Sequence, residues 1–290
     1  MLRYLCAMAL AVCISNVASA GWTRISEEVI RLDGPIDAES YADFKRVADG
    51  GFNKVILRSG GGLELIALKI AERIAEKDVE IEIDGYCFSA CANFLALAGR
   101  RLVVPCDSLI GWHGSHSLKT EDEVRDVHRT HEHPEELTET YLRWLDELRV
   151  REQNFYRRID VCHELLADSV RVPAHAFPQQ EPEVSFTFDP VTGEFTVSRR
   201  SETAGVWIPT ARVLEKYGIR TVGFCPKYDD PAHIEAVVSS LGLSELRFTS
   251  SGPYWRPESG DRFCAAVEHT RAISELNSPS ELKPIDTMPW

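Results

Sequence analysis

Ser89 and His113 are the two residues whose types and setting could carry acyl-transfer chemistry. Ser89 lies where the segment Gly85–Ala90 should turn into an apolar helix. Such a turn presents a hydroxyl beside a helix N-terminus, which favours developing negative charge. His113 follows 24 residues later, at the end of a short apolar segment. A serine becomes a nucleophile when a base takes its proton, and histidine is the commonest base. Alone, Ser89 would be interpreted as a helix cap and His113 as structural; together they predict a nucleophile and its base.

Alternating strands and helices must bring this pair together. The apolar run Val55–Leu57 predicts a buried strand, and the loop Ser59–Gly62 after it is one that glycines form easily. Leu63–Ala75 carries apolar residues at helical spacing. The remaining expected elements are a strand over Val79–Ile83, a turn that starts at Gly85, a helix over Ala92–Ala98, and strands over Leu102–Pro105 and Ser108–Gly111. This rhythm is typical of an α/β crossover fold.

Four motifs in this stretch resemble the Clp protease proteolytic subunit, within the superfamily shared with crotonases and signal peptide peptidases. Arg58–Gly62 resembles the family's Asn-Ser-Pro-Gly-Gly loop, and Gly85–Ala90 resembles its nucleophile turn. Leu97–Arg101 resembles the Ala-Ala-Gly segment that follows, and Ile110–His113 resembles the strand that ends in the family's histidine. The resemblance covers residues 55–116 well, and it returns faintly over residues 211–223.

The resemblance implies an α/β fold, a ClpP/crotonase-like spiral of repeated β-β-α units, here with a helical insertion and a β-hairpin insertion. It also implies that Ser89 is the nucleophile, that His113 is the base, and that the backbone N–H groups of Gly61 and Ala90 form the oxyanion hole. A glycine suits the first of these donors because substrate must approach its backbone closely. We expect no cofactor and no catalytic metal.

The third member of a triad is less defined. In the resembled family an aspartate precedes the last helix, and the matching position here falls near Val206, which cannot orient a histidine. Asp160 lies at about the right distance after His113 if the inserted hairpin is left out of the count, and Glu202 is the alternative on a different loop path. A Ser-His dyad and a decayed site remain open. Loss of the orienting acid costs roughly 10⁴ in rate in a well-studied serine protease.

The first twenty residues have the form of an export signal. Met1–Arg3 gives a positive start, Tyr4–Ile14 is apolar, and Ala18–Ala20 is an A-x-A cleavage site. The apolar run is shorter than the roughly 20 residues of a spanning helix, and the bulky residue before Cys13 disfavours lipidation. We therefore expect a periplasmic or secreted protein that starts at Gly21.

Cysteine usage agrees with export. Of eight cysteines, two lie in the expected signal, and the six that remain are Cys87, Cys91, Cys106, Cys162, Cys225 and Cys264. Six cysteines allow 15 full pairings, so the sequence does not fix the connectivity. Cys87 and Cys91 flank Ser89 and should share one face of a helical turn, where a disulfide would clamp the nucleophile turn. Free buried thiols are the alternative, and a zinc site lacks further ligands at matching spacing.

Charge and location limit the partners. The formal charge of −13 argues against nucleic acid, because a phosphate backbone needs a basic surface. No ATPase partner is expected outside the cytoplasm, so substrates should be short peptides or loosely folded chains. Glu135–Leu166 shows one apolar helical face. In the resembled family a long helix at this point projects and builds the oligomer. A helix that packs its apolar face on its own domain explains the pattern equally well. A homo-oligomer is thus possible.

The sequence divides into a signal (residues 1–20), a ClpP/crotonase-like domain (21–225, with an insertion at about 118–200) and a C-terminal extension of unknown role (226–290). His128, His131 and His133 could hold a metal, but Pro134 interrupts the segment and favours a solvated loop or helix end. Pro173–Pro182 predicts a linker or lid. The insertion should end in a hairpin over residues 184–197, and a helix is expected over residues 232–241.

Three functions are compatible with these residues. The first is an exported serine peptidase. The second is a binding or scaffold protein that keeps the fold and has lost the chemistry. The third is a crotonase-like acyl-group enzyme, and it is the least favoured because acyl-coenzyme A is a cytoplasmic metabolite.

Overall fold

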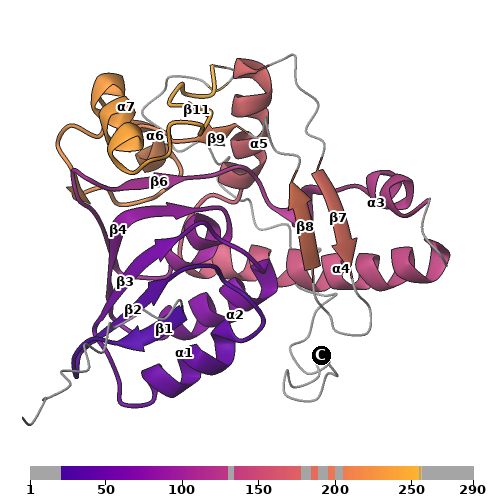
Figure 1. The fold of residues 1–290 in the computed structure, drawn as a ribbon, viewed down its shortest axis with the longest axis horizontal. Helices are drawn as coiled ribbons and strands as arrows, with labels where there is room; N and C mark the ends of the chain where they lie inside the picture. Colours follow the sequence, from indigo (N-terminus) through magenta and orange to yellow (C-terminus); the bar gives the residue numbers. More distant parts are fainter. Residues whose placement is uncertain are drawn as a thin grey trace, which may run out of the picture.

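A mixed, mostly parallel sheet is the centre of the protein (Figure 1). The computed structural model describes residues 21–129, 134–177, 184–188, 195–199, 205–254 and 256. The seven strands of the main sheet are β1 (Gly21–Arg24), β2 (Val29–Asp33), β3 (Lys54–Ser59), β4 (Glu80–Phe88), β5 (Arg101–Val104), β6 (Leu109–Gly111) and β10 (Gly223–Phe224). Their order is β1-β2-β3-β4-β5-β10, and β6 also pairs with β4. The pairing of β1 with β2 is antiparallel, and the other pairings in this sheet are parallel.

Helices cover the sheet because its strands are too apolar to face water. Val55 and Leu57 of β3 are fully buried. The helix α2 (Glu64–Ile74) is itself buried on most of its surface, since it contacts α1 (Ser40–Ala48) and the π turn η1 (Cys91–Leu95). Leu68, Ala71 and Ile74 of α2 are fully buried, so this helix is part of the core of the domain. The predicted α/β class is confirmed.

The strand β4 is longer than expected, and the predicted turn at Gly85 is wrong. Gly85 lies inside the strand with φ +83°, and its N–H donates to the hydroxyl of buried Ser108 at 2.9 Å. Residues before Gly85 pair with β5, whereas residues after it pair with β6. The left-handed glycine therefore kinks the strand at the point where it changes partner, instead of ending it.

The predicted helix over residues 92–98 is also wrong in type and length. A single π turn, Cys91–Leu95, replaces it, and the Ala96 N–H donates to the Cys91 carbonyl at 2.9 Å. The carbonyl of Asn93 accepts a hydrogen bond from the Tyr156 hydroxyl at 2.9 Å. Single π turns are frequent at functional sites.

The helical insertion packs on its own domain. It contains η2 (His116–Leu118), α3 (Glu121–His128), α4 (Pro134–Arg158) and α5 (Glu164–Ala176). Leu148 and Phe155 of α4 join the main core, and Arg151 forms an ion pair with Glu72 of α2 at 3.1 Å. His128 ends α3, as the predicted helix end requires, but it is buried and not solvated, while His131 and His133 are outside the described residues. Pro134 starts α4. The predicted linker from Pro173 is wrong at its start, because α5 includes Pro173 and continues to Ala176.

The remaining elements follow the insertion. The predicted hairpin is confirmed as antiparallel β7 (Val184–Phe188) and β8 (Phe195–Arg199), and its turn lies outside the described residues. After it come β9 (Val206–Trp207), α6 (Ala211–Lys216), α7 (Pro231–Ser240), which confirms the expected helix, and β11 (Phe248–Thr249). The expected signal segment and Glu202 are outside the described residues. None of the described helices is both long and apolar enough to cross a membrane.

Candidate active site

Ser89 lies in a strained turn between β4 and η1. Its φ is +56°, in the left-handed region that a serine rarely adopts. Its carbonyl accepts the N–H of Asn93 at 2.7 Å, so the helical turn starts directly after it. A non-glycine residue held in this region costs of order 1–3 kcal/mol and persists only where its surroundings enforce it. Such strain clusters at active sites, and a sharp strand-to-helix turn is how several hydrolases present a serine hydroxyl.

A disulfide encloses this turn, as the sequence predicted. Cys87 and Cys91 are bonded, with their Cα atoms 5.4 Å apart, and both are fully buried. Between them the two cysteines enclose three residues, Phe88, Ser89 and Ala90. The bond therefore holds together the last residues of β4 and the first residues of η1, and it contributes to the constraint that keeps Ser89 in its unfavourable conformation.

The backbone of the glycine loop, Ser59–Gly62, contacts the turn that carries Ser89. A Cβ atom on Gly61 would lie 2.6 Å from the Cβ of Ser89 and 3.0 Å from the N atom of Ala90, so only a glycine fits. The Gly61 φ of +98° requires a glycine as well. The two N–H groups expected to form an oxyanion hole thus come from adjoining segments.

These two donors differ in their present hydrogen bonds. The N–H of Gly61 donates to the hydroxyl of buried Ser59 at 3.1 Å. Ala90 is the first residue after the turn, where backbone N–H groups have no acceptor within their own helix. Ala90 is therefore the better-placed donor for an oxyanion, and Gly61 would have to share its hydrogen between Ser59 and the substrate.

The pairing of two strand ends joins the loop that carries His113 to the turn that carries Ser89. The strands β4 and β6 are parallel neighbours with Phe88 opposite Gly111, and the Ser89 N–H donates to the Gly111 carbonyl at 3.2 Å. His113 follows Gly111 by two residues and is half-buried, as Ser89 is. The serine and the histidine therefore emerge at the same edge of the sheet from adjacent strands.

The loop that carries His113 is fixed on one side by η1. The Asn93 side chain donates to the carbonyl of Gly114 at 2.8 Å, and the Tyr156 hydroxyl donates to the carbonyl of Asn93 at 2.9 Å. Burial, and after it the nearby carboxylate of Glu152, raise the pKa of Tyr156, so this phenol stays a donor. The Ser89 turn and the loop that carries His113 are thus tied to each other through Asn93.

The buried carboxylate of Glu152 also holds the loop that carries His113. Glu152 of α4 is 0% exposed and accepts hydrogen bonds from Ser115 at 2.7 Å, Ser117 at 2.6 Å and His163 at 2.6 Å. A buried carboxylate is tolerated only with such partners. These bonds hold the residues directly after His113.

A histidine–carboxylate pair lies at the other side of the loop. His116 Nδ1 lies 2.9 Å from the carboxylate of Glu64, which is 5% exposed, and the His116 backbone N–H donates to the same carboxylate at 3.1 Å. Glu64 is the first residue of α2, two residues after Gly62 at the end of the glycine loop. The pair therefore joins the glycine loop to the histidine loop.

The candidate acids lie in different parts of the chain. Asp160 lies two residues after the last residue of α4, with φ +57°, a left-handed conformation typical of the residue that follows a helix C-terminus, so helix termination already explains its place. Glu202 is outside the described residues. The strand β9 forms a bridge between Trp207 and Trp112, directly before His113, and it carries no carboxylate. The carboxylate of Asp168 in α5 accepts a hydrogen bond from the Tyr217 hydroxyl at 2.6 Å.

Sequence reasoning missed the residues that support the site, namely Asn93, Glu64, His116 and Glu152. The hydrogen bonds that tie them to the loop after His113 join residues 21 to 52 positions apart in the chain, so spacing does not reveal them. Glu152 alone had a local signal, because it interrupts the apolar face of a helix between Leu148 and Phe155. A carboxylate on a buried helical face points to a polar partner inside the protein.

Comparison with known proteins does not assign this chain to a family. Neither a protein-family model nor a curated protein sequence matches this chain. The functional assignment therefore rests on the chain's own geometry.

Proposed function

We propose that this protein is an exported serine peptidase that resembles the Clp proteolytic subunit, with Ser89 as nucleophile and His113 as base. The observation that carries the proposal is the left-handed conformation of Ser89. A disulfide, a glycine backbone and a strand pairing all converge on this one residue, and a structural serine needs none of them.

The proposed reaction uses the groups already described. His113 takes the proton of the Ser89 hydroxyl while the oxygen attacks the carbonyl carbon of a peptide. The N–H of Ala90, and that of Gly61, stabilise the oxygen that becomes negative. His113 then gives its proton to the leaving amine, and water releases the acyl group by the reverse steps. Asp160, or Glu202, is the proposed orienting acid; without one, the pair acts as a dyad.

The proposed fold and location follow the same reasoning. A mostly parallel sheet with glycine-loop, serine and histidine motifs at the ends of the neighbouring strands β3, β4 and β6 supports a ClpP/crotonase-like spiral of β-β-α units. The export-signal pattern and the disulfides support a periplasmic or secreted protein that begins at Gly21. In that compartment the substrates are short peptides or loosely folded chains, with no ATPase partner and no nucleic acid.

A binding or scaffold protein is the second candidate. The observation that favours it is the strand beside Trp112, because Val206 and Trp207 lie where the resembled family supplies its acid. A chain that has lost this acid and kept the fold would still offer the sheet edge and glycine loop to an extended peptide.

A peptide library separates the two candidates. The mature, oxidised protein is incubated with a diverse set of unstructured peptides, and the products are read by mass spectrometry, with Ser89→Ala as the matched control. The peptidase proposal predicts cleavage by the natural chain and none by the variant. Equal binding of peptides by both chains, without cleavage by either, would establish the scaffold in its place.

A further inference from the structure

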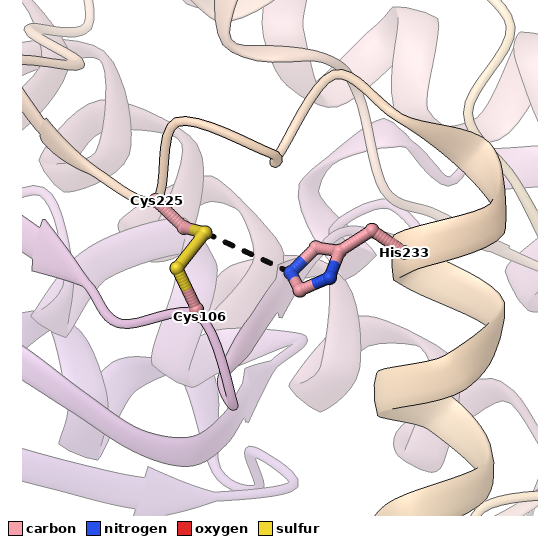
Figure 2. A group of neighbouring side chains, drawn as sticks. All are labelled: Cys106, Cys225 and His233. Carbon is pink, nitrogen blue, oxygen red and sulfur yellow. Dashed lines mark hydrogen bonds between the residues drawn. A yellow bond between two sulfur atoms is a disulfide. The ribbon is translucent and has the colours of Figure 1, made fainter.

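The second disulfide lies at the far edge of the sheet and forms part of a three-residue cluster (Figure 2). Cys106 follows β5 and Cys225 follows β10, and these two strands are parallel neighbours. Their sulfur atoms are bonded, and Nε2 of His233 on α7 lies 3.7 Å from the sulfur of Cys225. All three candidate ligand atoms lie within 4.8 Å of one another.

We propose that reduction of this disulfide creates a binding site for a thiolate-preferring divalent cation, with zinc as the reference ion, held by Cys106, Cys225 and His233. Two thiolates and one imidazole form a ligand set that zinc accepts, and a water molecule would complete a tetrahedral shell. The inference does not depend on the proposed peptidase activity, because the cluster is on different strand ends from Ser89.

The distances suit such an ion after a small movement. Zinc–sulfur bonds of ~2.3 Å and zinc–nitrogen bonds of ~2.0 Å at a tetrahedral angle place the sulfur and nitrogen atoms about 3.5 Å apart. The His233–Cys225 separation is already 3.7 Å. The two sulfur atoms, now 2.02 Å apart, have to separate to about 3.8 Å by the same geometry.

Accessibility gives a route for the reduction. Cys106 is exposed, whereas Cys225 is buried. A thiolate of an external dithiol attacks the exposed Cys106 sulfur, the disulfide breaks, and Cys225 leaves with the bonding electron pair beside His233. The second thiol of the reductant then displaces Cys106, so the dithiol is oxidised by two electrons and both protein sulfurs are reduced. Metal binding keeps both sulfurs as thiolates and His233 neutral, and it releases the remaining protons.

Cobalt(II) is the probe, because thiolate ligands give it a charge-transfer absorption band. The full mature chain carrying Cys87→Ser, Cys91→Ser, Cys162→Ser and Cys264→Ser, in which Cys106 and Cys225 are the two cysteines that remain after residue 20, is reduced with a phosphine, desalted without oxygen and titrated with cobalt(II), then with zinc. We expect one equivalent of cobalt with a thiolate band that zinc removes, and no band in the oxidised chain. His233→Ala in this background should weaken binding by at least roughly tenfold.

The decisive control is the variant that also carries Cys106→Ser and Cys225→Ser, which should show no thiolate band. A band that survives in this variant, or cobalt affinity that does not change in His233→Ala, would overturn the proposal. Near-ultraviolet circular dichroism monitors the fold at each step. A reduced chain that unfolds and does not regain its spectrum with either ion would also overturn it, since the site requires the folded arrangement.

Discussion

The two disulfides between described cysteines lie at strand ends of one sheet and differ in what they constrain. Cys87–Cys91 joins residues four positions apart around Ser89, and both sulfurs are buried. Cys106–Cys225 joins residues 119 positions apart and ties β5 to β10, with Cys106 exposed. Cross-linking a short loop removes little entropy from the unfolded chain, and cross-linking a long loop removes more. The first bond therefore shapes a site, and the second stabilises the fold.

The first prediction has the largest expected effect and concerns the region around the Cys87–Cys91 disulfide. If Ser89 and His113 act as one unit, Ser89→Ala and His113→Ala should each lower peptidase kcat by about 10⁴–10⁶, and the double variant should resemble either single one. Peptide cleavage by the purified variants measures this. Both variants should unfold at nearly the wild-type denaturant midpoint. Additive losses in the double variant would show that the two residues do not share a step.

The second prediction compares the disulfides directly. Replacing Cys106 and Cys225 by serine should lower the free energy of unfolding by roughly 5 kcal/mol, and the same change at Cys87 and Cys91 by roughly 2 kcal/mol. Urea unfolding under oxidising conditions measures both. The Cys87 and Cys91 variant should nevertheless suffer the greater loss of Ser89 reactivity. If the ranking of the two stabilities is reversed, the division of roles between the bonds is wrong.

The third prediction concerns the non-covalent support of the histidine loop. Glu152→Ala should destabilise the protein by roughly 3–4 kcal/mol, because Ser115, Ser117 and His163 lose a buried partner. Glu152→Gln keeps the shape and one acceptor, so its loss should be clearly smaller. Thermal unfolding of the two variants measures the difference. Equal, small losses would mean that the loop after His113 does not depend on this carboxylate.

The smallest of these effects is expected at the glycine loop. Gly61→Ala forces a Cβ atom against Ser89 and Ala90, so the turn must shift, and misplacement of about 1 Å can cost 10²-fold in rate. Gly60 is the matched control, because a Cβ atom there meets nothing within 4 Å. Gly60→Ala should keep its reactivity. If both variants react like the natural chain, the contact between the glycine loop and Ser89 has no catalytic role.

The sequence predicted the parts of the structure that depend on neighbours in the chain. The α/β class, the hairpin and the Cys87–Cys91 bond all follow from local spacing. The kink at Gly85 was missed because it depends on β4 exchanging one partner strand for another. The π turn was missed because apolar spacing over so short a segment does not distinguish it from an α-helix, and its contact with Tyr156, 63 positions away, is not visible in the sequence.

The residues of the candidate site likewise divide into those that local sequence identified and those that depend on distant partners. Ser89 and His113 were identified from their places at expected turns and strand ends, and their catalytic roles remain predictions. Glu152 and Glu64 were not identified, because their partners come from other elements of the fold. The Cys106–Cys225 pairing was one of many that the sequence allowed, and only the adjacency of β5 and β10 selects it.

Chemical labelling tests the central claim most directly. The mature, oxidised protein is treated with a fluorophosphonate, which reacts only with activated serines, and the modified peptide is identified by mass spectrometry. We predict a single phosphonylated residue, Ser89, with labelling abolished in Ser89→Ala and nearly abolished in His113→Ala. Labelling at another serine, or no labelling of the folded, oxidised chain, would contradict the claim that Ser89 is a nucleophile activated by His113.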